Sequence, residues 1–333
     1  MALPNPFQKQ KPTRARAKKS TNKRRSLPWG LDPKALAFVL VFAAIGTYMV
    51  YQSQAATPIT GLKVSGNRIV NGEGTPLRLM GVNHSGSEYA CSGGWGFFDG
   101  PNSEVASEAM VQKIASWKTN AVRVPLNEHC WLDINSNIPA ERRGTEYQQA
   151  ITNYVTLLNK YGIVPILELH YHAPGTRITA NNPMANRDNT PRFWASVANH
   201  FKSNTSVMFE LVNEPHPDNN SDTAEAWRCW RDGGACAGVK DRATGATYTA
   251  TGMQELVTAV RNTGARNVIL LGGIQYTNRL SRWLEYKPND PFNNLAAAWH
   301  VYDFNQCKTT ACFDGQLKPV ADKYPLVTTE IGP

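Results

Sequence analysis

The feature of this sequence that most restricts its fold is a regular alternation of short apolar runs with segments of helical periodicity. The helical segments include Glu104–Trp117 and Tyr147–Tyr161, where apolar residues recur at helical spacing. The apolar runs are Leu77–Val82, Ala121–Leu126, Ile163–Leu169, Val207–Val212, Val268–Leu271, Leu295–Val301 and Leu326–Thr329. Because these runs are short, continuous and apolar, they indicate strands of a parallel sheet that is covered by helices.

Polar side chains gather directly after these runs, at the carboxyl ends of the predicted strands. They are Asn83, His84, Asn127, Glu128, His170, His172, Asn213, Glu214, His300, Asp303 and Glu330. Such a ring is typical of a (β/α)8 TIM barrel, whose active site is built from the carboxyl ends of its strands. A doubly wound nucleotide-binding sheet is disfavoured, because no GxGxxG motif or P-loop follows the first run.

The predicted barrel domain spans residues 57–333, without repeats or a second linker. A small hairpin precedes it, with Leu62–Val64 and Arg68–Val70 flanking a turn. The chain reaches Pro333 directly after the seventh run, whereas a closed barrel of this type has eight strands. We therefore expect an α/β barrel truncated after strand 7, with two unpaired strand edges.

The positive charge lies at the amino-terminal end. The chain has a net charge of +9, and residues 1–34 hold ten Lys or Arg and one acidic residue. The remainder has 25 basic and 25 acidic residues and is formally neutral. A neutral body gives no support to nucleic-acid binding, so no nucleic-acid partner is expected.

An uncharged apolar run of 17 residues, 35–51, follows the basic tail. It is just long enough to cross a membrane as a transmembrane or signal-anchor helix. The cations before it predict that residues 1–34 lie in the cytoplasm and that the body is extracytoplasmic. Ser53-Gln54-Ala55 would also suit cleavage by signal peptidase, so a membrane-anchored and a secreted protein are both open.

The six cysteines of the body fit disulfides better than a metal site, since no CxxC pair or Cys/His cluster of zinc spacing occurs. Local pairing is one of the several connectivities that six cysteines allow. It predicts the bridges Cys91–Cys130, Cys229–Cys236 and Cys307–Cys312.

Two glutamates stand at the ends of the fourth and seventh predicted strands. Glu214 lies between Asn213 and Pro215, and the proline holds Glu214 away from helical dihedrals. Glu330 directly follows the run Leu326–Thr329. Both carboxylates are expected to face one cleft. Glycoside hydrolysis needs such a pair, with one carboxyl as proton donor and the other as nucleophile.

Six motifs in barrel order give the sequence a family resemblance. They are Leu77-Arg-Leu-Met-Gly-Val-Asn83, Val122-Arg-Val-Pro125, Leu167-Glu-Leu-His170, Phe209-Glu-Leu-Val-Asn-Glu-Pro215, Trp299-His-Val-Tyr302 and Thr329-Glu-Ile-Gly332. The chain resembles glycoside hydrolase family 5, the cellulase-like family. That resemblance implies that Glu214 is the acid/base and Glu330 the nucleophile.

The resemblance also implies the roles of the neighbouring residues. Arg123 would orient Glu330, and Asn213 would bond the 2-hydroxyl of the sugar. The remaining residues of the catalytic subsite would be His170, His300 and Tyr302. Physically, Arg123 could make a bidentate contact that keeps Glu330 ionised, as a nucleophile must be.

Other polar and aromatic residues have competing interpretations. His170 and His172 have the spacing of metal ligands on a strand, but no clear third or fourth ligand accompanies them, so neither a metal nor another cofactor is expected. Glu168 and Glu210 lie within strands, which favours a structural role inside the barrel. Glu128 follows Asn127 in imitation of the Asn213-Glu214 pair. Candidate sugar-stacking residues are Trp95, Trp131, Tyr171, Tyr276 and Trp283, for each of which core packing is an alternative.

These features predict retaining hydrolysis of a β-linked polysaccharide by double displacement, with β-1,4-glucan as the preferred substrate. Mannan, xylan and β-1,3-glucan remain open. The rival hypothesis is a noncatalytic carbohydrate-binding or cell-surface protein on a degenerate barrel. The expected partners are a polysaccharide or oligosaccharide and, through residues 35–51, a membrane. The protein is expected to be a monomer.

Overall fold

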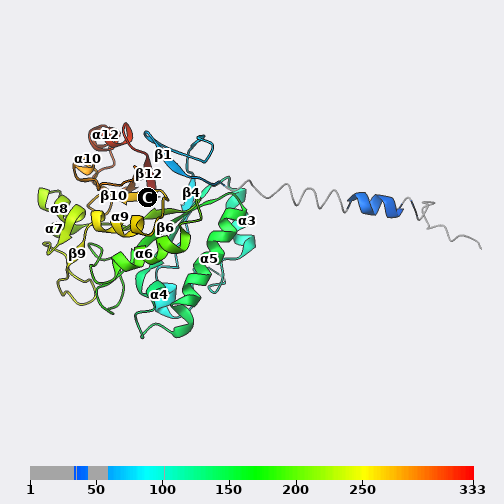
Figure 1. Cartoon of the computed structure of the whole chain (residues 1–333), viewed down its shortest axis with the longest axis horizontal. Coiled ribbons are helices and arrows are strands. Elements are labelled where there is room, and N and C mark those ends of the chain that lie inside the picture. The colour runs from blue at the N-terminus through cyan, green and yellow to red at the C-terminus, as the bar shows by residue number, and fades with distance from the viewer. Residues whose placement is uncertain (1–33, 35, 44–58, 101) are drawn as a thin grey trace, which may run out of the picture. The chain divides into compact units, whose positions relative to one another are not determined.

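A computed structural model describes residues 34, 36–43, 59–100 and 102–333 (Figure 1). The chain divides into two units, Met1–Gln54 and Ala55–Pro333. In the first, residues 36–43 are helical, and the rest of the predicted membrane segment 35–51 lies outside the described residues, as does almost all of the basic tail. None of the helices within the described ranges has both the length and the hydropathy that a membrane span needs.

The second unit begins with a small antiparallel sheet. β1 (Lys63–Ser65) and β2 (Arg68–Val70) pair around the predicted turn, which confirms the hairpin. A third strand, β3 (Pro76–Leu77), pairs with β2. The prediction of a first barrel strand at Leu77–Val82 was therefore partly wrong. Its beginning joins the small sheet, and only its end enters the barrel.

The main sheet consists of seven parallel strands in the described part of the chain, in the order β12-β11-β10-β7-β6-β5-β4. They are β4 (Gly81–Asn83), β5 (Ala121–Asn127), β6 (Val164–Tyr171), β7 (Met208–Glu210), β10 (Ile269–Gly272), β11 (Leu295–Val301) and β12 (Leu326–Ile331). Every strand except β4 falls within two residues of a predicted run. The sheet curls into a nearly closed barrel.

Helices follow the strands and cover the barrel from outside (Figure 1). The longer ones are α3 (Glu108–Ser116), α5 (Thr145–Lys160), α6 (Thr190–Phe201), α8 (Ala224–Asp232) and α9 (Met253–Asn262). The short ones include α2 (Ala90–Gly93), α4 (Glu128–Leu132), α7 (Pro217–Asn220), α10 (Trp283–Tyr286), α11 (Thr310–Cys312) and α12 (Lys318–Ala321). Two-residue strands β8 (Gly233–Gly234) and β9 (Ala250–Thr251) pair with each other.

The side chains alternate along each strand, which separates the barrel interior from the helix layer. Ile166 and Met208 belong to a buried cluster inside the barrel, here named the apolar floor. It also contains Leu62 and Ile69, so the small sheet packs against it. Their strand neighbours Leu167 and Phe209 belong to a separate and larger buried cluster, the core under the helices. Both faces of the main sheet are therefore buried, as the continuous apolar runs predicted.

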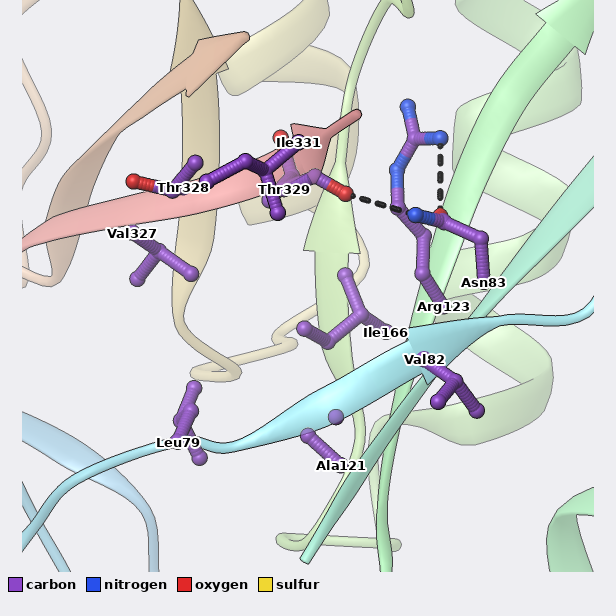
Figure 2. A pocket seen from close by; sticks show the side chains of 11 residues that line it. Leu79, Val82, Asn83, Ala121, Arg123, Ile166, Val327, Thr328, Thr329 and Ile331 are labelled. Carbon is purple, nitrogen blue, oxygen red and sulfur yellow. Dashed lines mark hydrogen bonds between the residues drawn. The ribbon is translucent and has the colours of Figure 1, made fainter. Parts of the chain in front are cut away.

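The barrel remains open between its two edge strands, β4 and β12, because these do not pair in a ladder. One side-chain bond crosses the opening, where Asn83 Nδ2 donates to the backbone oxygen of Thr329 over 2.9 Å. A cavity of about 370 Å³ lies there, and Figure 2 shows side chains of β4, β5, β6 and β12 around it. The lining includes Leu79, Val82, Ile166, Val327 and Ile331, with Asn83 and Arg123 as polar members.

All three predicted disulfides are present. Cys91–Cys130 joins α2 to α4, while Cys229–Cys236 and Cys307–Cys312 each close a short loop. Sequence proximity predicted the two short bridges, because closing a short loop costs less conformational entropy than closing a long one. The first bridge holds together two segments that follow neighbouring barrel strands.

Candidate active site

Arg123 is the centre of the polar layer above the apolar floor. It lies on β5 two residues after Ala121, on the same side of the strand. Its Nε donates to Glu210 Oε2 over 2.6 Å, and its Nη2 donates to Asn213 Oδ1 over 2.7 Å. Glu168 Oε2 is 3.4 Å from Nη2. The interior placement of Glu168 and Glu210 agrees with the structural role predicted for them.

Glu330 is reached by only one nitrogen of Arg123, since Nη1 donates to its Oε1 over 2.8 Å. The expected bidentate contact with Glu330 was therefore wrong. The other nitrogens of the guanidinium are engaged elsewhere, because Nε donates to Glu210 and Nη2 donates to Asn213. The orienting contact itself is present.

Glu330 is held in its ionised form. Burial opposes ionisation, but the charges of His300 and Arg123 and a hydrogen bond from Tyr302 outweigh it and lower the pKa of Glu330 to about 2. The Tyr302 hydroxyl donates to Glu330 Oε2 over 2.6 Å. At neutral pH this carboxylate is available as a nucleophile.

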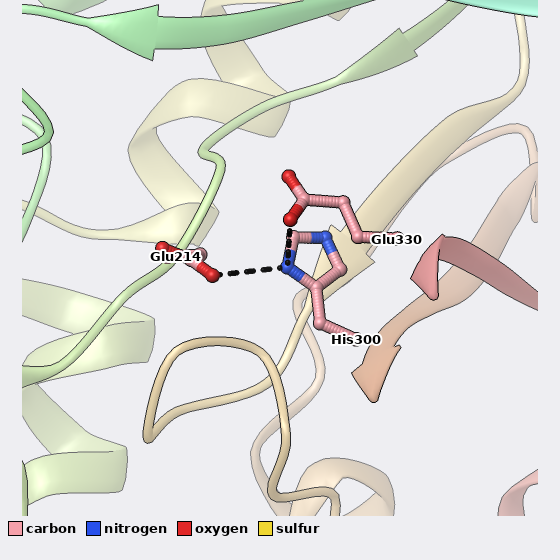
Figure 3. A group of neighbouring side chains, drawn as sticks. All are labelled: Glu214, His300 and Glu330. Atoms are coloured by element: carbon pink, nitrogen blue, oxygen red, sulfur yellow. Dashed lines mark hydrogen bonds and ion pairs between the residues drawn. The ribbon is translucent and has the colours of Figure 1, made fainter. Parts of the chain in front are cut away.

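His300 lies between the two glutamates, as Figure 3 shows. Its Nδ1 is 3.3 Å from Glu214 Oε1 and 3.6 Å from Glu330 Oε2. Its Nε2 is 3.0 Å from Thr329 Oγ1. Burial disfavours the charged ring, but hydrogen bonds to Glu210 and Glu214 and the charge of Glu330 raise the pKa of His300 to about 9. A protonated His300 balances the charge of the carboxylate pair.

Glu214 and Glu330 face each other at close range. One oxygen of each carboxyl and a nitrogen of His300 all lie within 4.8 Å of one another. Their side chains are 18% and 13% exposed, so both carboxyl groups are accessible from solvent. The barrel thus brings together two carboxylates that are far apart in the sequence.

The predicted site residue His170 also belongs to this cluster. Its Nδ1 is 3.0 Å from Glu168 Oε2, and its Nε2 is 3.3 Å from Asn213 Nδ2. His172 instead is fully buried, and neither of its ring nitrogens has a hydrogen-bond partner in the described part of the chain. The structure therefore places all seven predicted site residues together: Arg123, His170, Asn213, Glu214, His300, Tyr302 and Glu330.

Two contacts of the site were not predicted. Asn83 Oδ1 accepts from Arg123 Nη1 over 3.2 Å, so the end of β4 takes part in the polar layer. Asn181 Nδ2 donates to Glu214 Oε2 over 2.8 Å, from the connection between β6 and α6. The motif around Asn83 offered a signal in the sequence. Asn181 offered none, because it lies outside any strand run.

The candidate stacking aromatics divide clearly by exposure. Trp131 and Trp283 are fully buried, so the stacking hypothesis was wrong for both, and they pack in the core under the helices. Trp95 is 51% exposed. A side chain at Gly93 would collide with the Trp95 ring, which shows that the ring packs on the backbone of α2. Tyr171 and Tyr276 are partly exposed.

Glu214, His300 and Glu330 are close enough to act as three ligands of one metal ion. The local charges argue against this arrangement. A cation there would lie near the Arg123 guanidinium, which already contacts Glu330, and it would compete with the proton of His300. The site is therefore better suited to two carboxylates balanced by protein cations than to a metal.

Residues 70–332 match the sequence family described as cellulase, glycosyl hydrolase family 5. The chain belongs to this family. The match includes the strand-end residues from Asn83 to Glu330. Among curated proteins of similar sequence, an endoglucanase of Clostridium saccharobutylicum is 22% identical over 270 residues, which is 79% of this chain and 48% of that protein.

A second relative is the cellulase/esterase CelE of Acetivibrio thermocellus. It is 23% identical over 189 residues, covering 53% of this family 5 chain and 22% of the relative. The chain thus spans less than half the length of these curated relatives.

Solved structures share the barrel fold. The β-glucanase SdGluc5_26A of Saccharophagus degradans superposes with a TM-score of 0.57 at 17% identity, covering 84% of this chain and 75% of the other. The catalytic domain of Thermobifida fusca endoglucanase Cel5A has a TM-score of 0.51 at 16% identity, covering 81% of this chain and 73% of the other. The β-glucanase and a single-residue variant of Cel5A have also been crystallised with cellotetraose.

Proposed function

We propose that this family 5 chain hydrolyses β-linked glucan with retention at the anomeric carbon. The proposal rests on the close approach of Glu214 and Glu330, since one carboxyl oxygen of each lies within 4.8 Å of one of the other. Retaining enzymes hold their two carboxyl groups about 5 Å apart, whereas inverting enzymes leave room for a water molecule between them. Cellotetraose complexes of two structural neighbours support a β-1,4-glucan as substrate.

In the first step, Glu330 attacks the anomeric carbon while Glu214 donates a proton to the departing glycosidic oxygen. The low pKa of Glu330 suits attack by a carboxylate. In the second step, Glu214 removes a proton from water, which displaces Glu330 and releases the sugar. Asn213 would bind the 2-hydroxyl, and His170 and Tyr302 would line the same subsite.

The active-site glutamates provide the direct test. Glu214→Gln and Glu330→Ala are expected to abolish the release of reducing sugar from soluble β-1,4-glucan while leaving cello-oligosaccharide binding largely intact. Glu225→Gln is a matched control, because Glu225 is an exposed residue of α8 that pairs with Arg228. Proton NMR of the first product should show the β-anomer.

Turnover at the normal rate in either variant, or an α-anomer as first product, would overturn the mechanism. Assays on mannan, xylan and β-1,3-glucan test the choice of substrate independently of the mechanism. If the wild-type protein binds a β-glycan but turns over none of them, the noncatalytic carbohydrate-binding hypothesis replaces hydrolysis.

We also propose an extracytoplasmic location, as a membrane-anchored or secreted protein. Three disulfides support it, because such bridges form and persist in oxidising compartments. Thiol labelling of the protein from its native source, with and without a reductant, tests the proposal. Freely reactive cysteines in the unreduced protein would contradict it.

A further inference from the structure

Glu128 follows Asn127, as Glu214 follows Asn213, but it is fully buried. None of its hydrogen bonds within the described residues joins it to the catalytic cluster. Its Oε1 accepts from Asn186 Nδ2 over 2.8 Å, and its Oε2 accepts from Thr190 Oγ1 over 2.5 Å. The backbone N–H of Ala173 also donates to Oε1, over 3.4 Å. These partners lie at the two ends of residues 173–190, the connection between β6 and α6, here named the Asn181 loop.

The middle of the Asn181 loop is held by a second set of contacts. His172 and Ala180 exchange two backbone hydrogen bonds, of 3.0 and 3.2 Å. The buried Asn182 accepts from the backbone N–H of Arg242 over 2.8 Å and donates to the His172 oxygen over 2.7 Å. The backbone on both sides of Asn181 is therefore fixed.

The side chain of Asn181 is turned toward the catalytic acid/base. Its Nδ2 donates to Glu214 Oε2 over 2.8 Å, while its Oδ1 is buried without a hydrogen-bond partner in the described residues. Buried amides in purely structural positions normally satisfy both ends. The other Glu214 oxygen, Oε1, faces His300 Nδ1. Glu214 is thus held from two sides, and Asn181 supplies one of them.

We propose that Asn181 is a positioning residue for Glu214 and that Glu128 acts through it by clamping both ends of the Asn181 loop. The inference rests on the proposed function, in which Glu214 is the acid/base. A neutral N–H donor favours the ionised carboxylate over the acid and fixes its rotamer. Asn181 therefore helps Glu214 to change from acid in the first step to base in the second.

The test is the pH dependence of kcat/KM in Asn181→Ala. Loss of the donor should move the alkaline limb to higher pH by about one unit, because the carboxylate form of Glu214 loses a hydrogen bond. The other titratable groups that face Glu214 are His300 on β11, Glu330 on β12, Tyr302 after β11 and His216 on its own segment, and all are unchanged in the variant. Asn199→Ala, on the exposed face of α6, is the control.

Substrates with different leaving groups separate positioning from general damage. A β-cellobioside with a good aryl leaving group needs little proton donation, so Asn181→Ala should lose about tenfold less activity on it than on cellotetraose. Equal losses on both substrates, or a pH profile identical to wild type, would overturn the role of Asn181. If Glu214→Gln is itself fully active, the proposed function fails instead.

The clamp is tested by Glu128→Ala, with Glu128→Gln as a second variant that keeps the size of the side chain and is the readout if Glu128→Ala does not fold. The variant should shift the alkaline limb as Asn181→Ala does, and the double variant should show no further shift, because both changes act on one contact. Additive shifts, or a Glu128 variant that folds with the wild-type profile, would show that Glu128 does not act through Asn181.

Discussion

At the residue scale, Glu214 and Glu330 differ in the hydrogen-bond donors that hold their carboxylates. Glu330 has Arg123 and Tyr302 as donors, and its pKa is about 2. Glu214 shares His300 with Glu330, but it has a neutral amide where Glu330 has a guanidinium. Because a guanidinium favours the charged carboxylate far more than an amide does, this asymmetry suits a permanent nucleophile beside a group that must gain and lose a proton.

Tyr302→Phe tests the source of this asymmetry. Removing a donor to a carboxylate raises its pKa, so the acid limb of kcat/KM should move to higher pH by about one unit. At pH 6 Glu330 would still be ionised, since its pKa starts from about 2, and the loss there should be much smaller than in the acid limb. The measurement is the pH-rate profile on cellotetraose.

Tyr161→Phe provides the matched control for Tyr302→Phe. The Tyr161 hydroxyl also donates to a carboxylate, that of the exposed Glu108 on α3. Its removal should leave the acid limb unchanged. An acid limb that does not move in Tyr302→Phe would show that a group other than Glu330 governs it.

At the element scale, the disulfides differ in the length of chain that they close. Cys91–Cys130 spans a separation of 39 residues and joins α2 to α4, whereas Cys307–Cys312 spans 5. A bridge that closes a longer loop removes more conformational entropy from the unfolded chain. The long bridge also secures α2, on whose backbone the exposed Trp95 ring rests.

The double variant Cys91→Ala with Cys130→Ala should lower the free energy of unfolding by about 4 kcal/mol, against about 2 kcal/mol for Cys307→Ala with Cys312→Ala. Urea unfolding followed by tryptophan fluorescence measures both. An equal or larger loss for the short bridge would contradict the loop-length argument.

Trp95 provides a second prediction at this scale. Its ring packs on α2 and is 51% exposed, which suits an aromatic surface for the apolar face of a sugar. Trp95→Ala should raise KM for a long oligosaccharide by about tenfold, with little change in kcat on a short aryl glycoside. The exposed Trp117→Ala, at the end of α3, is the control. An unchanged KM in Trp95→Ala would show that Trp95 packs on α2 without binding the sugar.

At the scale of the whole molecule, the barrel has two edges, β4 and β12, which carry backbone groups without a ladder partner in the described sheet. Central strands are bonded on both sides. The cavity of about 370 Å³ between the edges also removes packing contacts from their side chains. Local opening should therefore begin at these edges.

Amide hydrogen exchange followed by mass spectrometry tests this expectation. Peptides that cover β4 and β12 should exchange about tenfold faster than peptides that cover β6 and β10, since local opening costs less free energy at an edge. Asn83→Ala should speed the exchange of β12 further, because it removes the side-chain bond to the Thr329 oxygen. Uniform protection across the seven strands would contradict the open-edge description.

The sequence by itself determined the repeating strands and helices, the residues at the strand ends and the local disulfides. These properties depend on side-chain periodicity and on short loops, which are visible in a single stretch of chain. For this reason Glu214 and Glu330 could be predicted as site residues before their contacts were known, whereas Arg123, inside the run Ala121–Leu126, was implied by the family resemblance. The beginning of the first barrel strand could not be predicted in this way, because Leu77 pairs with β2 rather than with a barrel strand.

Only the tertiary structure decided which partners these residues meet. Arg123 shares its nitrogens among Glu210, Asn213, Glu330 and Asn83, and this division depends on how the curled sheet brings several strand ends together. The contact of Asn181 with Glu214 depends on a loop held from outside its own sequence. The physical reason is the same in both cases: hydrogen bonds require a few tenths of an ångström of precision, which the curvature of the barrel provides and a local sequence pattern does not.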